Sequence, residues 1–124
     1  DLWGQNWSSL LNIVLGDSSK TLNITKSMER KNYSVLDMVK RSEDYYVSLG
    51  FPRLSKKFWQ NSVFTNRGNN KKNCHGSAAN MYEIGDYRMM GCFQVNEGDL
   101  RVIFHELGHI YYYMAYGDEQ AIFQ

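Results

Sequence analysis

Two histidines and a glutamate lie within one short stretch near the end of the chain, RVIFHELGHIYYYMAY (residues 101–116). Residues four apart on an α-helix project from the same face, so His105 and His109 can direct their imidazole nitrogens to one zinc ion. Glu106 lies one position round the helix, where its carboxylate is badly placed as a ligand but well placed to accept a proton from a water on the metal. This H-E-x-x-H order predicts peptide hydrolysis.

A catalytic zinc site needs three protein ligands, and this motif supplies only two. A metzincin would have a glycine at position 112 and a third histidine at position 115, but these residues are Tyr112 and Ala115. Asp118 and Glu119 are the carboxylates that follow His109, and they lie just past the expected end of the helix. Carboxylates at that separation from His109 are badly placed for the chain to fold back and bind them to the same ion.

The helix that carries the motif is expected over about residues 97–116. Asn96 is placed as its N-cap, and Asp99 at the third helical position faces the unsatisfied amides of the first turn. A glycine inside a helix, such as Gly108, lowers helix stability by up to about 1 kcal/mol relative to alanine. Its presence indicates that another group lies close to the helix backbone here, either for function or as a packing contact. The alternative interpretation is a structural helical module with an accidental motif.

Earlier segments have the apolar spacing of helices that build a core. A first amphipathic helix, ended by Gly16 and Asp17, has one stripe made of Trp3, Trp7, Leu10, Leu11 and Val14. A second helix is expected to be capped by Ser34 with Asp37 and to end before Gly50 and Pro52. Its inward-facing residues would be Val35, Met38, Val39, Tyr46 and Leu49. Ser55 caps a short third helix that contains Phe58 and Trp59.

The residues between Cys74 and Cys92 have a different character. Two short segments flank the turn sequence EIGD and can pair as antiparallel strands, with a cysteine near each open end. A disulfide there would close the hairpin and stabilise it by about 3 kcal/mol. The alternative is two buried free thiols.

Composition limits the chain to one domain at most, because it has 124 residues, of which 43% are hydrophobic. Its net charge of +1 and its scattered basic residues indicate no nucleic-acid partner. Neither a membrane span nor a signal peptide is visible in the sequence. N-x-S/T sequons at Asn6, Asn23 and Asn32, together with the two cysteines, favour the secretory route.

The run CHGSAANMYEIGDYRMMGCFQVNEGDLRVIFHELGHIYYYMAY resembles the zinc-binding core of the angiotensin-converting enzyme family of peptidases. The upstream segments DLWGQNW and SLGFPRLSKKFWQNSVF match that family in the right order, so the resemblance covers essentially the whole chain. It implies a mainly α fold: part of a large helical zincin peptidase domain with a short antiparallel β-hairpin before the zinc helix. Residues 1–124 would be a partial peptidase domain, incomplete at both ends, of a secreted protein or of the extracellular ectodomain of a membrane protein. Any membrane anchor would lie outside this chain.

The resemblance also implies an activity, which is the cleavage of short peptide substrates near their carboxyl end, usually with release of a dipeptide. The enzyme would be a dipeptidyl carboxypeptidase or a carboxypeptidase that uses zinc and is often activated by chloride. His105 and His109 would be metal ligands and Glu106 the general base. His75 would donate to a substrate carbonyl, and Cys74 and Cys92 would form a disulfide. The substrate would pair as an added strand with Gly76, Ser77 and Ala78.

The sequence departs from the family pattern in three ways. Phe104 replaces the histidine that usually precedes the motif, and Gly76 stands where alanine or proline is common. The family's third zinc ligand is a glutamate roughly two dozen residues after the second histidine, which is beyond Gln124. The isolated chain is therefore predicted to be inactive. The alternative is a non-catalytic peptide-binding or receptor ectodomain that has lost the third ligand.

Overall fold

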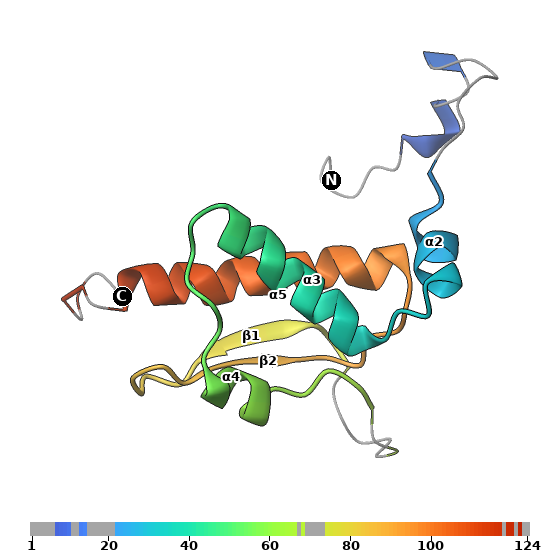
Figure 1. The fold of residues 1–124 in the computed structure, drawn as a ribbon. Coiled ribbons are helices and arrows are strands. Elements are labelled where there is room, and N and C mark those ends of the chain that lie inside the picture. Colours follow the sequence, from blue (N-terminus) through green and yellow to red (C-terminus); the bar gives the residue numbers. More distant parts are fainter. Residues whose placement is uncertain are drawn as a thin grey trace.

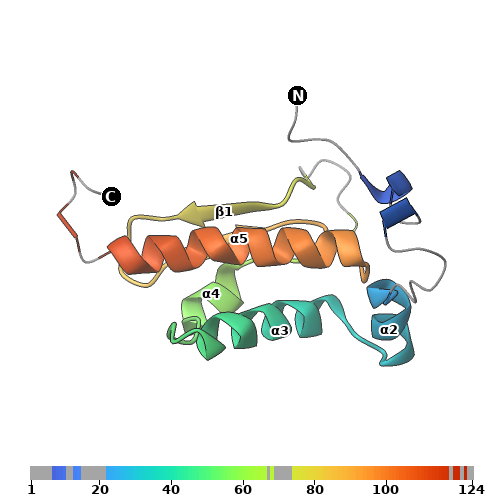
Figure 2. The same cartoon turned by 90° about the horizontal axis from the view of Figure 1, so that it is seen from above.

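The computed structural model describes residues 7–10, 13–14, 22–66, 68, 74–117, 119–120 and 122. The fold is mainly α, as predicted, with one two-stranded antiparallel sheet. The elements are, in chain order, a 3-10 helix η2 (Ser8–Leu10), α2 (Ile24–Arg30), α3 (Val35–Ser48), α4 (Lys56–Asn61), β1 (Ser77–Asn80), β2 (Tyr87–Met90) and α5 (Glu97–Tyr116). Figure 1 shows the long helix α5 between α3 and the hairpin, and in Figure 2 β1 runs along one side of α5 with α3 on the other.

Helix α5 begins and ends at the residues predicted from the sequence. The Asn96 side chain caps it by accepting a hydrogen bond from the backbone N–H of Asp99 at 2.7 Å. The Asp99 carboxylate, however, accepts from the N–H of Gln94 at 2.6 Å, which precedes the helix, instead of facing the first-turn amides. The first helical N–H, that of Glu97, donates to the Thr25 hydroxyl at 3.0 Å and thereby ties α2 to the start of α5.

Helices α3 and α4 also begin at the predicted caps. Ser34 and Asp37 form a reciprocal capping box at the start of α3, and the Ser55 side chain accepts from the N–H of Phe58 in α4. The chain leaves α3 through Gly50, whose φ of +98° is a backbone conformation that glycine adopts without strain. Leu49, predicted to point inward, is instead 58% exposed, because it is the C-cap residue and lies beyond the buried face of the helix.

The predicted hairpin is present. Ser77 pairs with Met90 at its open end, where the structure contains the Cys74–Cys92 disulfide. The other edge of β2 is also bonded, because the backbone of Val63 exchanges hydrogen bonds with Met89 and Gly91 on that side. β1 is therefore the outer strand among the described residues, and it packs along α5.

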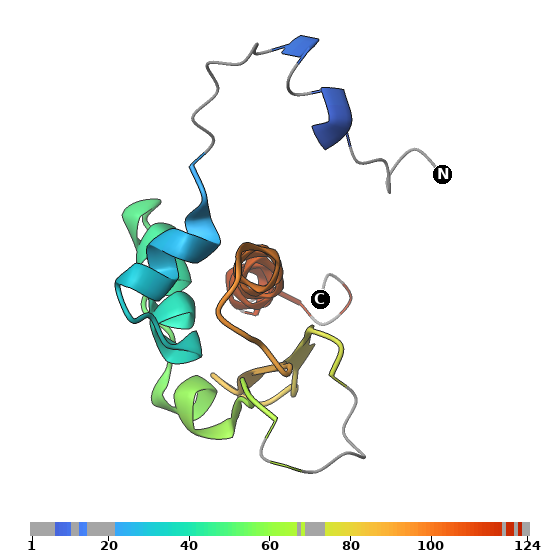
Figure 3. The ribbon, with the colours of Figure 1, turned by 90° about the vertical axis from the view of Figure 1, so that its right-hand side faces the viewer.

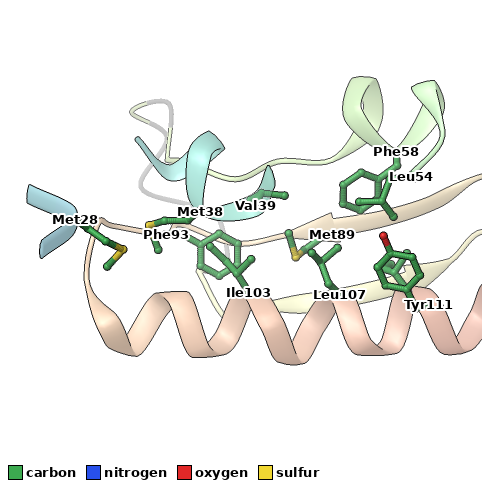
Figure 4. Close-up of a cluster of buried hydrophobic side chains, with 11 residues drawn as sticks. Met28, Met38, Val39, Leu54, Phe58, Met89, Phe93, Ile103, Leu107 and Tyr111 are labelled. Atoms are coloured by element: carbon green, nitrogen blue, oxygen red, sulfur yellow. The ribbon is translucent and has the colours of Figure 1, made fainter. Parts of the chain in front are cut away.

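The core lies where α5 meets α3, α4 and the hairpin. Figure 4 shows side chains from these elements converging above one face of α5, and Figure 3, viewed along α5, shows the elements arranged around that helix. The fully or nearly fully buried apolar residues are Met28, Met38, Val39, Leu54, Phe58, Met89, Phe93, Ile103, Leu107, Ile110 and Tyr111. The members of this set on α5 lie on one face of the helix, so the motif histidines occupy the opposite, exposed face.

Two regions differ from the sequence-based expectation. The first predicted helix lies partly outside the described residues, and its described part contains the 3-10 helix η2, with Trp7 and Val14 at 63% and 75% exposure instead of in the core. Figure 1 shows η2 apart from the packed elements, and the described members of the stripe, Trp7, Leu10 and Val14, are all exposed. Helix α2 was not predicted; it is capped by Asn23, whose side chain accepts from Lys26.

Candidate metal centre and substrate cleft

The two motif histidines meet on the exposed side of α5. Their Nε2 atoms lie 3.1 Å apart, and both side chains are exposed. Two imidazole nitrogens bound to one tetrahedral zinc ion at about 2.0–2.1 Å would be roughly 3.3–3.4 Å apart. The observed separation differs from this by a few tenths of an ångström. The pair therefore fits two positions of a zinc site without rearrangement of the helix.

A third ligand is not found among the residues that the structure describes. No group of three histidine, cysteine, aspartate or glutamate side chains in those ranges is arranged to hold a metal ion. Glu119 lies within the described part and does not join the histidines, whereas Asp118 lies outside it. A catalytic zinc site built on His105 and His109 thus requires one more protein donor.

Glu106 lies at the boundary between the exposed histidines and the interior. Its side chain is only 8% exposed, and it lines a cavity of about 570 Å³ together with His105. The cavity is formed between α5 and the segment around the disulfide, and its further lining residues are Cys74, His75, Gly76, Cys92, Phe93, Asp99, Arg101 and Val102. A carboxylate next to a metal-binding histidine in such a cavity can act as a general base.

The predicted substrate-binding residues are divided between this cavity and the strand beside it. His75, which is exposed, and Gly76 line the cavity, whereas Ser77 and Ala78 are the first two residues of β1 and do not. Gly76 lies close to α5, because a Cβ added there would be 2.6 Å from Cγ1 of Val102 and 3.6 Å from Cγ of Glu106. The glycine allows the extended chain to approach the motif closely.

Gly108 has a structural explanation that the sequence alone did not provide. A Cβ at this position would lie 2.9 Å from the hydroxyl oxygen of Tyr46 on α3. That hydroxyl donates a hydrogen bond of 2.8 Å to the backbone carbonyl of Phe104, one residue before His105. Burial raises the pKa of Tyr46, which keeps the phenol protonated as a donor. The group that approaches α5 closely at Gly108 is therefore the Tyr46 hydroxyl of α3.

Aromatic residues extend the motif stripe toward the end of α5. The ring of Tyr113 is nearly parallel to that of His109, with centroids 6.3 Å apart. Burial raises the pKa of Tyr113, and the nearby Tyr116 phenol and Glu106 carboxylate add to the shift. Sequence reasoning missed Tyr113, although its spacing of four residues from His109 places both on one helical face.

Of the three predicted glycosylation sites, two lie in the described part. Asn23 and Asn32 are exposed, and Asn6 lies outside the described residues. The side-chain oxygen of Asn23 caps α2, and that bond does not use the amide nitrogen to which a glycan would attach. Across the described ranges, no helix combines the length and the apolar character needed to cross a membrane.

Comparison with known proteins extends the resemblance seen in the sequence. The profile of the family described as "Angiotensin-converting enzyme" matches residues 1–124. An "Angiotensin-converting enzyme-related protein" from Drosophila melanogaster is 32% identical over 125 residues, which is 100% of this chain and 20% of that protein. "Angiotensin-converting enzyme" from Mesocricetus auratus is 32% identical over 126 residues, 100% of this chain and 10% of that protein. The protein of the same name from Sus scrofa is 31% identical over 98% of this chain and 9% of its own length. The chain thus spans a tenth to a fifth of the length of the first two relatives, and it belongs to the angiotensin-converting enzyme family.

Proposed function

We propose that the chain is the part of a zinc metallopeptidase domain that carries two metal ligands, the general base and one wall of the substrate cleft. The observation that carries this proposal is the convergence of the His105 and His109 Nε2 atoms to 3.1 Å beside the carboxylate-lined cavity. The third ligand would be a carboxylate outside these residues. Membership in the angiotensin-converting enzyme family supports the same function.

The proposed reaction is the release of a dipeptide from the carboxyl end of a short peptide. A zinc ion held by His105 and His109 supplies Lewis acidity for this hydrolysis. Glu106 takes the proton from the attacking water and passes it to the leaving amine, and its near-complete burial shields that transfer from bulk solvent. Chloride is proposed as an activator of the intact protein.

Substrate orientation is assigned to β1 and His75. β1 is the outer strand of the described sheet, so its free edge can accept an extended peptide at Ser77 and Ala78 through backbone hydrogen bonds. His75 at the cavity then donates to a carbonyl of the bound peptide. The apolar walls, Phe93 and Val102, favour the exclusion of water from this part of the cleft.

The test is Glu106→Gln in the intact protein, with an N-blocked tripeptide as the substrate. General-base catalysis contributes about 10²–10⁴-fold, so kcat should fall by that factor while the zinc content and thermal stability stay unchanged. Glu29→Gln, on the exposed surface of α2, is the matched control and should retain full activity. A Glu106→Gln protein with the original kcat would contradict the assigned role.

A second candidate is a peptide-binding ectodomain without catalysis. It is equally compatible with the two histidine donors of the described part, because it would lack the third ligand that the peptidase requires from outside these residues. The two candidates differ in the intact wild-type protein, since only the peptidase hydrolyses the tripeptide. Peptide binding without any hydrolysis, in protein shown to be folded, supports the second candidate.

We also propose that the protein is secreted or is an extracellular ectodomain, and that it carries N-linked glycans. The Cys74–Cys92 disulfide and the exposed Asn23 and Asn32 support this location. Peptide mass spectrometry of protein from a secreting host should find glycans on these two asparagines. Both asparagines unmodified in the secreted protein would contradict the glycosylation proposal.

A further inference from the structure

We propose that Tyr46 is a positioning residue for the metal centre, acting through the backbone of α5 at the turn that carries His105. The proposal rests on the proposed zinc site. Tyr46 lies on α3, 58 residues before Phe104 in the sequence, and its hydroxyl donates to the carbonyl of Phe104 at 2.8 Å. This is a direct bond between the neighbouring helix and the motif turn.

The Tyr46 ring is held in place on several sides. It stacks on Tyr111 of α5 with centroids 4.5 Å apart and an interplanar angle of 29°. The rings of Tyr45 and Phe51 meet it edge to face at 5.3 Å and 6.0 Å. The hydroxyl therefore cannot swing away from Phe104 without loss of these contacts, so α3 sets the position of the bond.

The bond constrains the turn from which the site projects. In an α-helix the carbonyl of Phe104 is the acceptor for the N–H of Gly108, and a carbonyl oxygen has a second lone pair that the Tyr46 hydroxyl can use. Both donors thus hold the turn that contains His105 and Glu106. A local distortion of this turn would change the separation of the His105 and His109 Nε2 atoms. The binding of both histidines to one metal ion depends on that separation.

Gly108 leaves the space that the Tyr46 hydroxyl occupies beside α5. Any side chain at position 108 would place its Cβ 2.9 Å from the Tyr46 hydroxyl oxygen, whereas the next atom of the ring, Cζ, would be at 3.9 Å. The hydroxyl alone therefore excludes a larger residue. Glycine is disfavoured in helix interiors, so its presence inside the motif is explained by the room that this hydroxyl needs.

The experiment is a double-mutant cycle in the intact protein with Tyr46→Phe, Gly108→Ala and the combination. Two quantities are measured for each protein, the melting temperature without zinc and the zinc dissociation constant by chelator competition. Tyr45→Phe is the matched control, because it removes a hydroxyl from the adjacent, half-exposed tyrosine, whose hydrogen bonds in the described part all involve its backbone.

Gly108→Ala should lower the melting temperature in the wild-type background, because its methyl group displaces the hydroxyl. In the Tyr46→Phe background the same substitution should raise the melting temperature, because alanine is the better helix former and meets nothing closer than 3.9 Å. Tyr46→Phe alone should weaken zinc binding by about tenfold, the low end of the effect of outer-sphere partners. Tyr45→Phe should leave both quantities unchanged.

The possible failures are distinguishable. Wild-type protein that binds no zinc would overturn the proposed function together with this role. Wild-type protein that binds zinc, with Tyr46→Phe binding it equally well, would overturn only the positioning role and leave Tyr46 as a packing residue. A Gly108→Ala effect on melting temperature with the same sign and size in both backgrounds would show that the hydroxyl contact does not exist.

Discussion

The two faces of α5 differ in whether residues of this chain satisfy all the contacts that each face needs. On the inner face Ile103, Leu107 and Ile110 are completely buried against α3 and the hairpin. On the outer face His105 and His109 are exposed, and among the described residues no third donor joins them. The inner face is buried by contacts within this chain, whereas the outer face holds only two of the three protein ligands that the proposed zinc site requires.

We therefore expect the effects of substitutions on stability to be separable along α5 from their effects on the proposed zinc site. Glu106 and Leu107 are consecutive residues, yet the first lines the cavity and the second packs in the core. Substitutions of the buried apolar residues of α5 should act on folding, and substitutions of His105, Glu106 or His109 should act on metal binding and turnover.

Leu107→Ala should reduce the free energy of unfolding by about 2–5 kcal/mol, because it removes a fully buried side chain at the centre of the core. Zinc affinity, measured on the fraction that remains folded, should not change. His109→Ala is the converse variant, and it should abolish zinc binding while leaving the zinc-free stability intact. Urea unfolding and calorimetry measure the two quantities, and a loss of both in either variant would break the separation.

Gly76→Ala should destabilise the protein by about 1–3 kcal/mol, because its Cβ would lie 2.6 Å from Cγ1 of Val102. Movement of the segment away from α5 should also raise KM for the tripeptide more than it lowers kcat. The double variant with Val102→Ala should recover most of the stability, since the next atoms, in Phe93 and Glu106, lie at 3.5 Å and 3.6 Å. If the double variant does not regain stability, the destabilisation by Gly76→Ala does not come from its contact with Val102.

Asn96→Ala should cost about 1 kcal/mol of stability, because it removes the side chain that caps the Asp99 N–H. The cap is more than two turns from His105, so zinc affinity should remain at the wild-type value. Asn96→Asp keeps the acceptor and is the matched control. A weakened zinc affinity in Asn96→Ala alone would mean that the helix start and the motif are coupled.

Local signals predicted much of this structure. The caps at Ser34, Ser55 and Asn96 and the two strands follow from residues within a few positions of one another, and all are observed. The approach of His105 to His109 follows equally from a four-residue spacing on one helix. In these places the sequence pattern and the final contact involve the same few residues.

Contacts between distant segments could not be predicted in this way. The bond from Tyr46 to Phe104 spans 58 residues, and the backbone pairing of Val63 with β2 joins segments with no shared motif. Apolar spacing around Trp7 identified an amphipathic stripe but not what covers it, and that side chain is exposed. Periodicity indicates a face, whereas the partner of that face depends on the whole fold.

A calorimetric zinc titration of the intact protein, compared with its His109→Ala variant, tests the proposed metal centre on α5. We predict tight one-to-one binding to the wild-type protein and loss of that binding in the variant, with the circular dichroism of the two zinc-free proteins superimposable. Equal zinc affinity in both proteins would contradict the central claim, because the outer face of α5 would then not be the metal centre.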